Sequence, residues 1–321
     1  SWCVNDGACQ RIHACPSFEE VTVLRKRTPR SGDEHVNLSD LPEPATPLHA
    51  DQDMWRCYLA GVGGMGIGTS TAILVRAGHE MGYDVQFLDK KGLAIRNGGV
   101  FSQLVYSRNQ ETGDRKQGTG DRKTSDVGPS GPTAFTTPII PYGKADLLLG
   151  IDLLEAARSL DPAQPYRVAS PQRTAAVVNT AKTPTILALM GKDDFRVGDI
   201  EGSIRQYTRE GHCFNFNVGD LCERVLDSKL YANIMMLGIA FQKGYLPMTL
   251  EAIEKSIRTV IRSDVERNLR AFNVGRKIAV RPDLFVVEAR HEYETSLKAF
   301  RRKVNTMRAW YGGGRKGKRV A

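Results

Sequence analysis

Three cysteines near the start of the chain have the residue type and the spacing of metal ligands. Cys3, Cys9 and Cys15 are separated from one another by five residues, and Pro16 follows the last of them. Thiolates at short, regular spacing are typical of zinc sites and iron–sulfur clusters. A [4Fe–4S] cluster needs four thiolates, so with three here the fourth ligand is expected outside this chain.

Two other interpretations of these cysteines stay open. The spacing is wider than the C-x2-C-x2-C run of bacterial ferredoxins, although a proline after the last cysteine is shared with that run. Zinc with His13 as a fourth ligand is one alternative, and unliganded surface thiols are the other. The remaining cysteines are scattered and are expected inside the fold. Six cysteines are too few for a disulfide scaffold in a chain of this size.

A glycine-rich loop is the second feature that could do chemistry. A short apolar segment is followed by Gly61, Gly63, Gly64 and Gly66, and a helical pattern starts near Thr69. In this arrangement one glycine makes the tight turn, one lets the backbone approach a pyrophosphate, and one lets helix and strand pack closely. The helix N-terminus would then point its N–H groups at an anion. We therefore expect a phosphate cradle with these five residues.

Whether the cradle holds a dinucleotide is left open by the sequence. Asp89 closes the next predicted strand, where a carboxylate that binds a ribose would sit. Lys90 and Lys91 beside it do not favour a ribose diol. Three alternatives stay open. The loop binds some phosphate-bearing ligand, it binds NAD specifically, or it is a glycine turn that binds no ligand.

These residues need a scaffold, and hydrophobic patterning predicts alternating strands and helices. Such alternation is typical of a Rossmann-like α/β fold, a mainly parallel sheet with flanking helices. Strands are expected at 56–60, 84–88, 100–106, 145–150, 174–179 and 213–217. Helices are expected at 69–81, 151–159, 198–210, 230–242, 249–261 and 263–273.

Composition divides the chain into four parts, the third of which contains an insertion. Residues 1–27 form the cysteine-rich segment, and the polar, proline-containing stretch 28–53 is expected to be a linker. The α/β domain spans 54–287, and 107–132 within it is almost devoid of apolar side chains and repeats Thr-Gly-Asp-Arg-Lys, which predicts a mobile insertion. Residues 288–321 form a basic C-terminal extension.

The overall composition is that of an ordinary globular protein. The 321 residues are 41% hydrophobic and 25% charged, with a mean hydropathy of −0.34, and no apolar run approaches the roughly 20 residues of a membrane span. Membrane, collagen-like and wholly disordered classes are excluded. No signal peptide is visible, so we expect a cytoplasmic location. Because the sequence begins at Ser1 among cysteines, we expect a processed subunit or a fragment.

The net charge of +9 is concentrated at one end of the chain. No acidic residue follows Glu294, whereas nine basic residues do: Lys298, Arg301, Arg302, Lys303, Arg308, Arg315, Lys316, Lys318 and Arg319. The rest of the chain is nearly neutral. A solvated extension, or one that docks on an acidic partner, is therefore favoured over binding of nucleic acid.

Taken together, these features resemble the 2-oxoacid:ferredoxin oxidoreductases, most closely the indolepyruvate (aryl-pyruvate) type. The cysteine segment resembles the end of that family's ferredoxin module, and the rest resembles its gamma domain. The stretches that carry the resemblance are 3–18, 61–66 with 92–100, 145–150 with 176–180, and 233–254. The family often has a glutamine where this chain has Ile95.

The resemblance implies thiamine diphosphate, Mg2+, coenzyme A and iron–sulfur clusters in the whole complex. No Gly-Asp-Gly motif, which binds thiamine diphosphate in the family, occurs in this chain. We therefore expect the carbon chemistry on another chain or an upstream region, with ferredoxin or another carrier as electron acceptor. The resemblance further implies that the gamma domain supports coenzyme A binding, with Arg96 as a phosphate partner.

Two competing functions are kept. The glycine loop alone would also suit an NAD-dependent Rossmann dehydrogenase, and the basic tail would suit a protein that binds nucleic acid or an assembly partner. We expect no acid–base pair for catalysis within this chain, and its scattered histidines show no ligand spacing.

Overall fold

The computed structural model describes residues 36–90, 99–108, 137–160, 167–183 and 195–285, with 301 and 304–305. The chain divides into two compact units, residues 1–31 and 32–321, and everything described belongs to the second. The predicted ferredoxin-like segment lies outside the described residues. So do most of the predicted insertion and most of the basic extension.

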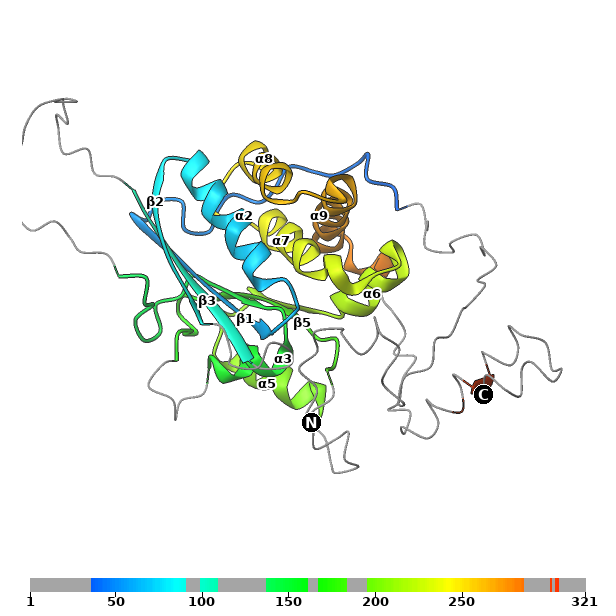
Figure 1. Ribbon diagram of the computed structural model, residues 1–321. Helices are drawn as coiled ribbons and strands as arrows, with labels where there is room; N and C mark the ends of the chain where they lie inside the picture. Colours follow the sequence, from blue (N-terminus) through cyan, green and yellow to red (C-terminus); the bar gives the residue numbers. More distant parts are fainter. Residues whose placement is uncertain are drawn as a thin grey trace, which may run out of the picture. The chain divides into compact units, whose positions relative to one another are not determined.

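A six-stranded sheet forms the centre of the described unit (Figure 1). Its order is β2-β3-β1-β4-β5-β6, and β1, β4, β5 and β6 run parallel to one another. The predicted α/β class with a mainly parallel sheet is confirmed. The strands are β1 Met54–Val62, β2 Tyr83–Lys90, β3 Gly99–Arg108, β4 Leu147–Gly150, β5 Ala175–Asn179 and β6 Cys213–Phe216.

One part of the sheet departs from a purely parallel arrangement. β3 is antiparallel to both β1 and β2, and it lies between them. Only residues 91–98 connect β2 to β3, which is too short for the crossover that two parallel neighbours need. β3 also extends to Arg108, so the first two residues of the predicted insertion are strand. Because β3 takes the place next to β1, β2 lies at the edge of the described sheet.

Helices cover both faces of the sheet (Figure 1). On one face lie α2, α7, α8 and α9, and on the other lie α3 and α5. None of the helices in the described ranges is long and apolar enough to cross a membrane. The bounds are α2 Ile67–Glu80, α3 Leu153–Arg158, α5 Val197–Gln206, α6 Val218–Leu226, α7 Ala232–Gln242, α8 Leu250–Val260 and α9 Val265–Val280, with short 3-10 turns at Lys229–Tyr231 and Pro282–Phe285.

The sequence did not predict α6. Its N-cap is Asn217, whose side chain accepts a hydrogen bond from the backbone N–H of Asp220 at 3.1 Å. An asparagine followed three residues later by an acidic residue is a start signal that could have revealed this helix. Gly219 in the first turn obscured it, because glycine has a low helix propensity.

Helix α7 is buried on every side, and α9 crosses it at backbone contact. All 11 residues of α7 are buried. A Cβ atom on Gly238 would collide with the carbonyl oxygen of Phe272, and one on Gly275 would collide with that of Met235. The two helices can approach this closely only because neither glycine carries a side chain.

Residues 36–53, which the sequence places in a linker, are held against this helix layer. The side chain of Gln242 donates to the carbonyl oxygens of Pro42 and Glu43, both at 3.0 Å. The Lys277 ammonium lies 2.5 Å from a carboxylate oxygen of Asp40. Apolar side chains in this stretch were too sparse to show periodicity, so its attachment through backbone carbonyls left no sequence signal.

A buried ionic cluster fastens the end of this segment to the sheet. Asp146, just before β4, accepts a hydrogen bond from the Arg56 backbone N–H at 2.8 Å. Its other oxygen lies 2.6 Å from the Arg173 guanidinium and 3.4 Å from Nε2 of His49. Burial raises the pKa of Asp146 to about 6. Burial, together with nearby arginines, lowers the pKa of His49 to about 4.

The helix crossing can be tested by adding one methyl group to it. Gly275→Ala places a Cβ against the backbone of α7, which cannot move aside as a side chain could. We expect a loss of about 3 kcal/mol in the free energy of unfolding, measured by chemical denaturation of the full chain. Gly202→Ala in α5, where a Cβ meets open space, should gain about 0.5–1 kcal/mol. Equal effects of the two variants would contradict the crossing.

Protonation of His49 in this buried ionic cluster is expected to lower the free energy of unfolding as the pH falls. Because the pKa of His49 is lower in the folded protein than its ordinary 6.5, its contribution to stability is present above pH 6.5 and is lost as pH falls toward 4. The destabilisation caused by His49→Gln should therefore shrink by about 2 kcal/mol between pH 7.5 and pH 5. Asp146 is present in both proteins, so comparing them cancels most of its own titration. Parallel stability curves for both proteins would refute this.

Candidate functional site

The glycine loop connects β1 to α2 at the carboxyl ends of the parallel strands. Gly64 and Gly66 have φ angles of 98° and 78°, in the left-handed region that favours glycine. A Cβ on Gly61 would lie 2.9 Å from Ile67 and 3.3 Å from Ile151, so this glycine permits close packing of the strand on its neighbours. The loop therefore needs its glycines for backbone geometry and for packing.

The first turn of α2 is open to a ligand. Gly66 is its N-cap and offers no side-chain oxygen, and the turn contains no acidic residue. By contrast, the side chain of Asp152 accepts two backbone N–H groups at the start of α3. Gly68 and Thr69 are exposed, and a Cβ on Gly68 would meet nothing within 4 Å. Uncapped N–H donors and the positive end of the helix dipole make this turn suited to an anion.

Asn233 of α7 supports the loop from beneath. Its Nδ2 donates to the carbonyl oxygen of Gly66 at 3.0 Å and to Oγ of Ser70 at 3.1 Å. A Cβ on Gly66 would lie 2.6 Å from that same nitrogen. Asn233 is 4% exposed, and its Oδ1 is buried with no hydrogen-bond partner among the described residues. The Asn233 amide therefore holds the loop backbone through its Nδ2 donor, while its Oδ1 is enclosed within the fold.

Sequence reasoning missed Asn233 as a site residue. The residue appeared only within a stretch that carried the family resemblance. A usable signal was present, because Asn233 is a polar residue at the start of an otherwise apolar helical run. Buried polar side chains are usually hydrogen-bonded, which made a partner elsewhere in the fold predictable. The identity of that partner was not.

The loop lies where the chain switches from one face of the sheet to the other. β1 and β4 are parallel neighbours, and the helices that follow them, α2 and α3, pack on opposite faces. In open α/β sheets, ligands bind in the crevice outside the carboxyl ends of such strands. Glu155 in the first turn of α3 lies against Gly99, and burial raises its pKa.

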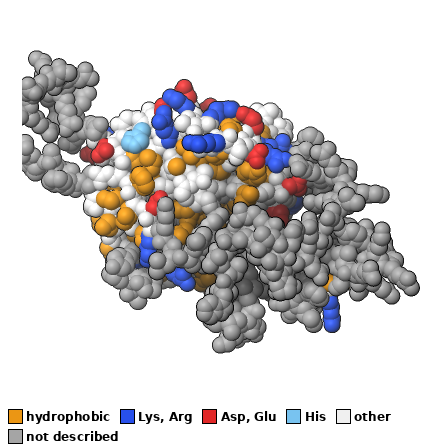
Figure 2. All heavy atoms as spheres, in the orientation of Figure 1, with side chains coloured by type: hydrophobic (Ala, Val, Ile, Leu, Met, Phe, Trp, Pro, Cys, Tyr) orange, Lys and Arg blue, Asp and Glu red, His pale blue; other side chains and the backbone are white. Residues whose placement is uncertain are grey.

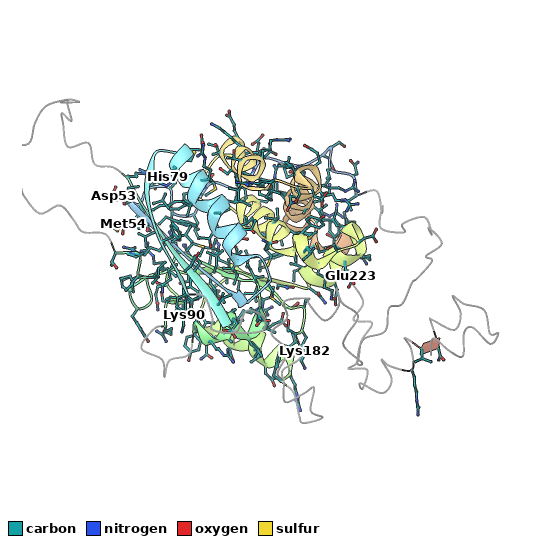
Figure 3. The ribbon with its side chains drawn as sticks, viewed as in Figure 1. Asp53, Met54, His79, Lys90, Lys182 and Glu223 are labelled. Carbon is teal, nitrogen blue, oxygen red and sulfur yellow. The ribbon has the colours of Figure 1, made fainter. Side chains whose placement is uncertain are left out.

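Asp89 does not occupy the place of a ribose-binding carboxylate. In a dinucleotide fold the second strand lies beside the first, whereas here β3 separates β2 from β1. Two strand spacings of about 4.8 Å put Asp89 roughly 10 Å away from β1. Its carboxylate accepts a hydrogen bond from Oγ of Ser102 at 2.5 Å. Figure 3 labels the next residue, Lys90, at the end of the sheet away from Asp53 and Met54.

The remaining predicted ligands fall outside the described ranges. These are Cys3, Cys9, Cys15 and Arg96. Within those ranges, no three histidine, cysteine or acidic side chains come together in a way that could hold a metal ion. Cys57 and Cys222 are buried thiols, and burial raises the pKa of Cys222 to about 12. Neither has the character of a thiolate ligand.

The chain is similar to known oxidoreductase subunits. The family model described as pyruvate ferredoxin/flavodoxin oxidoreductase matches residues 56–121 and 130–278. The indolepyruvate oxidoreductase subunit IorB of Archaeoglobus fulgidus is 26% identical over 225 residues, which are 69% of this chain and 94% of that protein. The IorB subunit of Methanothermobacter thermautotrophicus is 25% identical over 223 residues, 69% of this chain and 95% of that protein.

Among solved structures, the chain is similar to the pyruvate oxidoreductase subunit PORC of Thermotoga maritima. The identity is 17% and the TM-score 0.43, over 70% of this chain and 97% of that one. The family model, which covers both the glycine loop and the helix that supports it, confirms the family resemblance of the α/β domain. The chain belongs to the pyruvate ferredoxin/flavodoxin oxidoreductase family.

Proposed function

We propose that this chain is the gamma-type component of a thiamine-diphosphate-dependent 2-oxoacid ferredoxin oxidoreductase of the indolepyruvate type, acting in the reducing cytoplasm. Its glycine loop binds a phosphate-bearing ligand, for which coenzyme A is the best fit. The membership of the family and the names of the curated relatives support the reaction class. The geometry of the loop supports the ligand.

One observation carries the ligand assignment: the first turn of α2 has neither a side-chain cap nor an acidic residue. Its free N–H groups suit a diphosphate, and the space at Gly64 and Gly68 leaves room for one. Coenzyme A carries such a diphosphate.

The structure favours this ligand over NAD. A dinucleotide needs an acidic residue beside the loop for the ribose diol. The candidate, Asp89, is one strand too far away and is engaged by Ser102. We therefore retain the phosphate cradle and set aside the dehydrogenase interpretation.

The division of labour in the complex follows from what the chain contains. Thiamine diphosphate, when bound, supplies the chemistry that cleaves the bond to the carboxylate of a 2-oxoacid. With no Gly-Asp-Gly motif in this chain, that cofactor would be held by a partner chain or an upstream region. This chain would orient the acyl acceptor at α2 and pass electrons through a cluster on Cys3, Cys9 and Cys15, with ferredoxin or another carrier as acceptor.

A charge placed at the first turn of α2 tests the ligand site. Gly68→Glu puts a carboxylate among the N–H donors, and we expect it to weaken coenzyme A binding to the purified complex at least about tenfold by calorimetry. Gly68→Gln has nearly the same size without the charge, and it should weaken binding much less. Both variants should raise thermal stability, because they replace a helical glycine.

The pair of variants separates the possible outcomes. If both variants bind coenzyme A like the unmodified complex, the loop is not its site. If NADH binds saturably and Gly68→Glu abolishes that binding, the ligand assignment is wrong in favour of a dinucleotide. Since both substitutions favour the helix, loss of binding in the glutamate variant alone does not come from misfolding.

The cluster assignment has its own test. We expect Cys9→Ala to remove one [4Fe–4S] cluster's iron and acid-labile sulfide from the anaerobically purified complex. Cys213→Ala is the matched control, because Cys213 lies in β6 and burial raises the pKa of its thiol. Unchanged iron and sulfide in Cys9→Ala would refute the assignment. Retention of metal as zinc would favour the alternative site with His13.

A further inference from the structure

A surface cavity of about 720 Å³ lies at the amino ends of β5 and β6. Its lining comes from α5, from the segment 207–213 that leads into β6, and from Pro171, which precedes β5. Since β1, β5 and β6 run parallel, this edge of the sheet is opposite to the glycine loop, which follows the carboxyl end of β1. The volume is within the range of small-ligand sites in proteins. The cavity is therefore a candidate site for a second ligand.

Two guanidinium groups line this cavity without a paired counter-charge. Arg205 lies in the last turn of α5, and Arg209 lies between α5 and β6. Neither forms an ion pair with a carboxylate in the parts of the chain that the structure describes. Glu210 also lines the cavity, and it is unpaired among the same residues. The helix dipole favours a cation at Arg205, but Arg209 lies three residues beyond the helix, where the dipole does not account for it.

The charge of Arg209 acts on two neighbouring histidines. Burial lowers the pKa of His212, and the charge of Arg209 lowers it further. At His49 burial is again the largest cause of a lowered pKa, followed by the charges of Arg173 and Arg209. The buried carboxylate here, Asp146, is already in contact with Arg173. Positive charge is therefore in excess beside the cavity, and an anion would offset it.

The exposed basic side chains of α2 and α8, by contrast, lie beside acidic ones. Arg76 and Lys255 both contact the carboxylate of Glu80, and Arg258 contacts Glu266. Figure 2 shows blue and red side chains intermingled over the part of the surface where Figure 1 places these two helices. Two unpaired guanidinium groups that share one cavity depart from this pattern.

We propose that this cavity binds a small anion that carries a carboxylate or a phosphate on an apolar body. Arg205 and Arg209 bind the anionic group, because a guanidinium presents parallel N–H donors that match the oxygens of a carboxylate or phosphate. Cys213 and Pro171 offer the apolar contacts, and Cys213 is half-buried against the apolar cluster beneath α3 and α5. Burial raises the pKa of the Cys213 thiol, which keeps this contact uncharged. The site does not depend on the ligand at α2.

Calorimetry on the purified complex tests the site with three probes that share a benzene ring. Benzoate carries a carboxylate and phenyl phosphate a phosphate, whereas benzyl alcohol is neutral. We expect at least one of the two anions to bind saturably, and the alcohol to bind at least about tenfold more weakly than that anion. If neither anion binds saturably, or if the alcohol binds equally well, the proposal is overturned.

Charge-neutralising variants locate the binding. Arg205→Gln and Arg209→Gln should each weaken binding of the anion about tenfold, because each removes charge-assisted hydrogen bonds. Arg196→Gln is the matched control, since it removes the same charge from the exposed N-cap of the same helix, outside the cavity. It should leave binding unchanged. Equal weakening in all three variants would indicate a general effect of charge and would overturn the site.

A change that fills the cavity leaves its charges in place. A Cβ atom on Gly202 meets nothing within 4 Å, so Gly202→Leu should occupy the cavity without disturbing α5 and should weaken anion binding at least about tenfold. Full binding in this variant would contradict the cavity as the site.

Two further outcomes would assign the anion or the cavity differently. Anion binding that is lost in Gly68→Glu and kept in Arg209→Gln belongs to the glycine loop, which would overturn the cavity site and leave the coenzyme A proposal standing. Anion binding to the isolated full chain but not to the complex would mean that a partner subunit fills the cavity, and it would overturn the small-molecule assignment.

Discussion

The close crossing of α7 and α9 is the constraint on which the rest of the described structure depends. Gly238 and Gly275 bring the two backbones into contact, and no larger residue fits at either position. The crossing presses α7 into the centre of the helix layer, where all of its residues are buried. Polar side chains on such a helix must find partners inside the fold, because water does not reach them.

The two ends of α7 meet this requirement in different places. Asn233 at its start hydrogen-bonds the glycine loop, and Gln242 at its end hydrogen-bonds the segment that precedes β1. Gln242 also accepts a hydrogen bond from the Arg276 guanidinium of α9 at 2.9 Å. One buried helix thus fixes both the candidate ligand loop and the route by which the chain enters the domain. A shift of α7 at its crossing with α9 would therefore alter the hydrogen bonds of both Asn233 and Gln242.

How far the sequence predicted the fold and the site depended on the range of the interactions involved. The strands and most of the helices were predictable, since each depends on hydrophobic periodicity within a few residues. The position of β3 between β1 and β2 was not, because strand order depends on contacts between distant segments. The glycines of the loop were recognised from their spacing, whereas Asn233 lies 167 residues beyond Gly66 in sequence.

The sequence by itself determined the α/β class, the glycine loop that opens α2 and the membership of a redox family, because motif and periodicity are local properties. Tertiary structure alone decided that β3 separates Asp89 from β1, that Asn233 supports the loop and that β2 lies at the edge of the described sheet. Strand order and helix crossing set these positions, and both arise from packing between segments that are far apart along the chain.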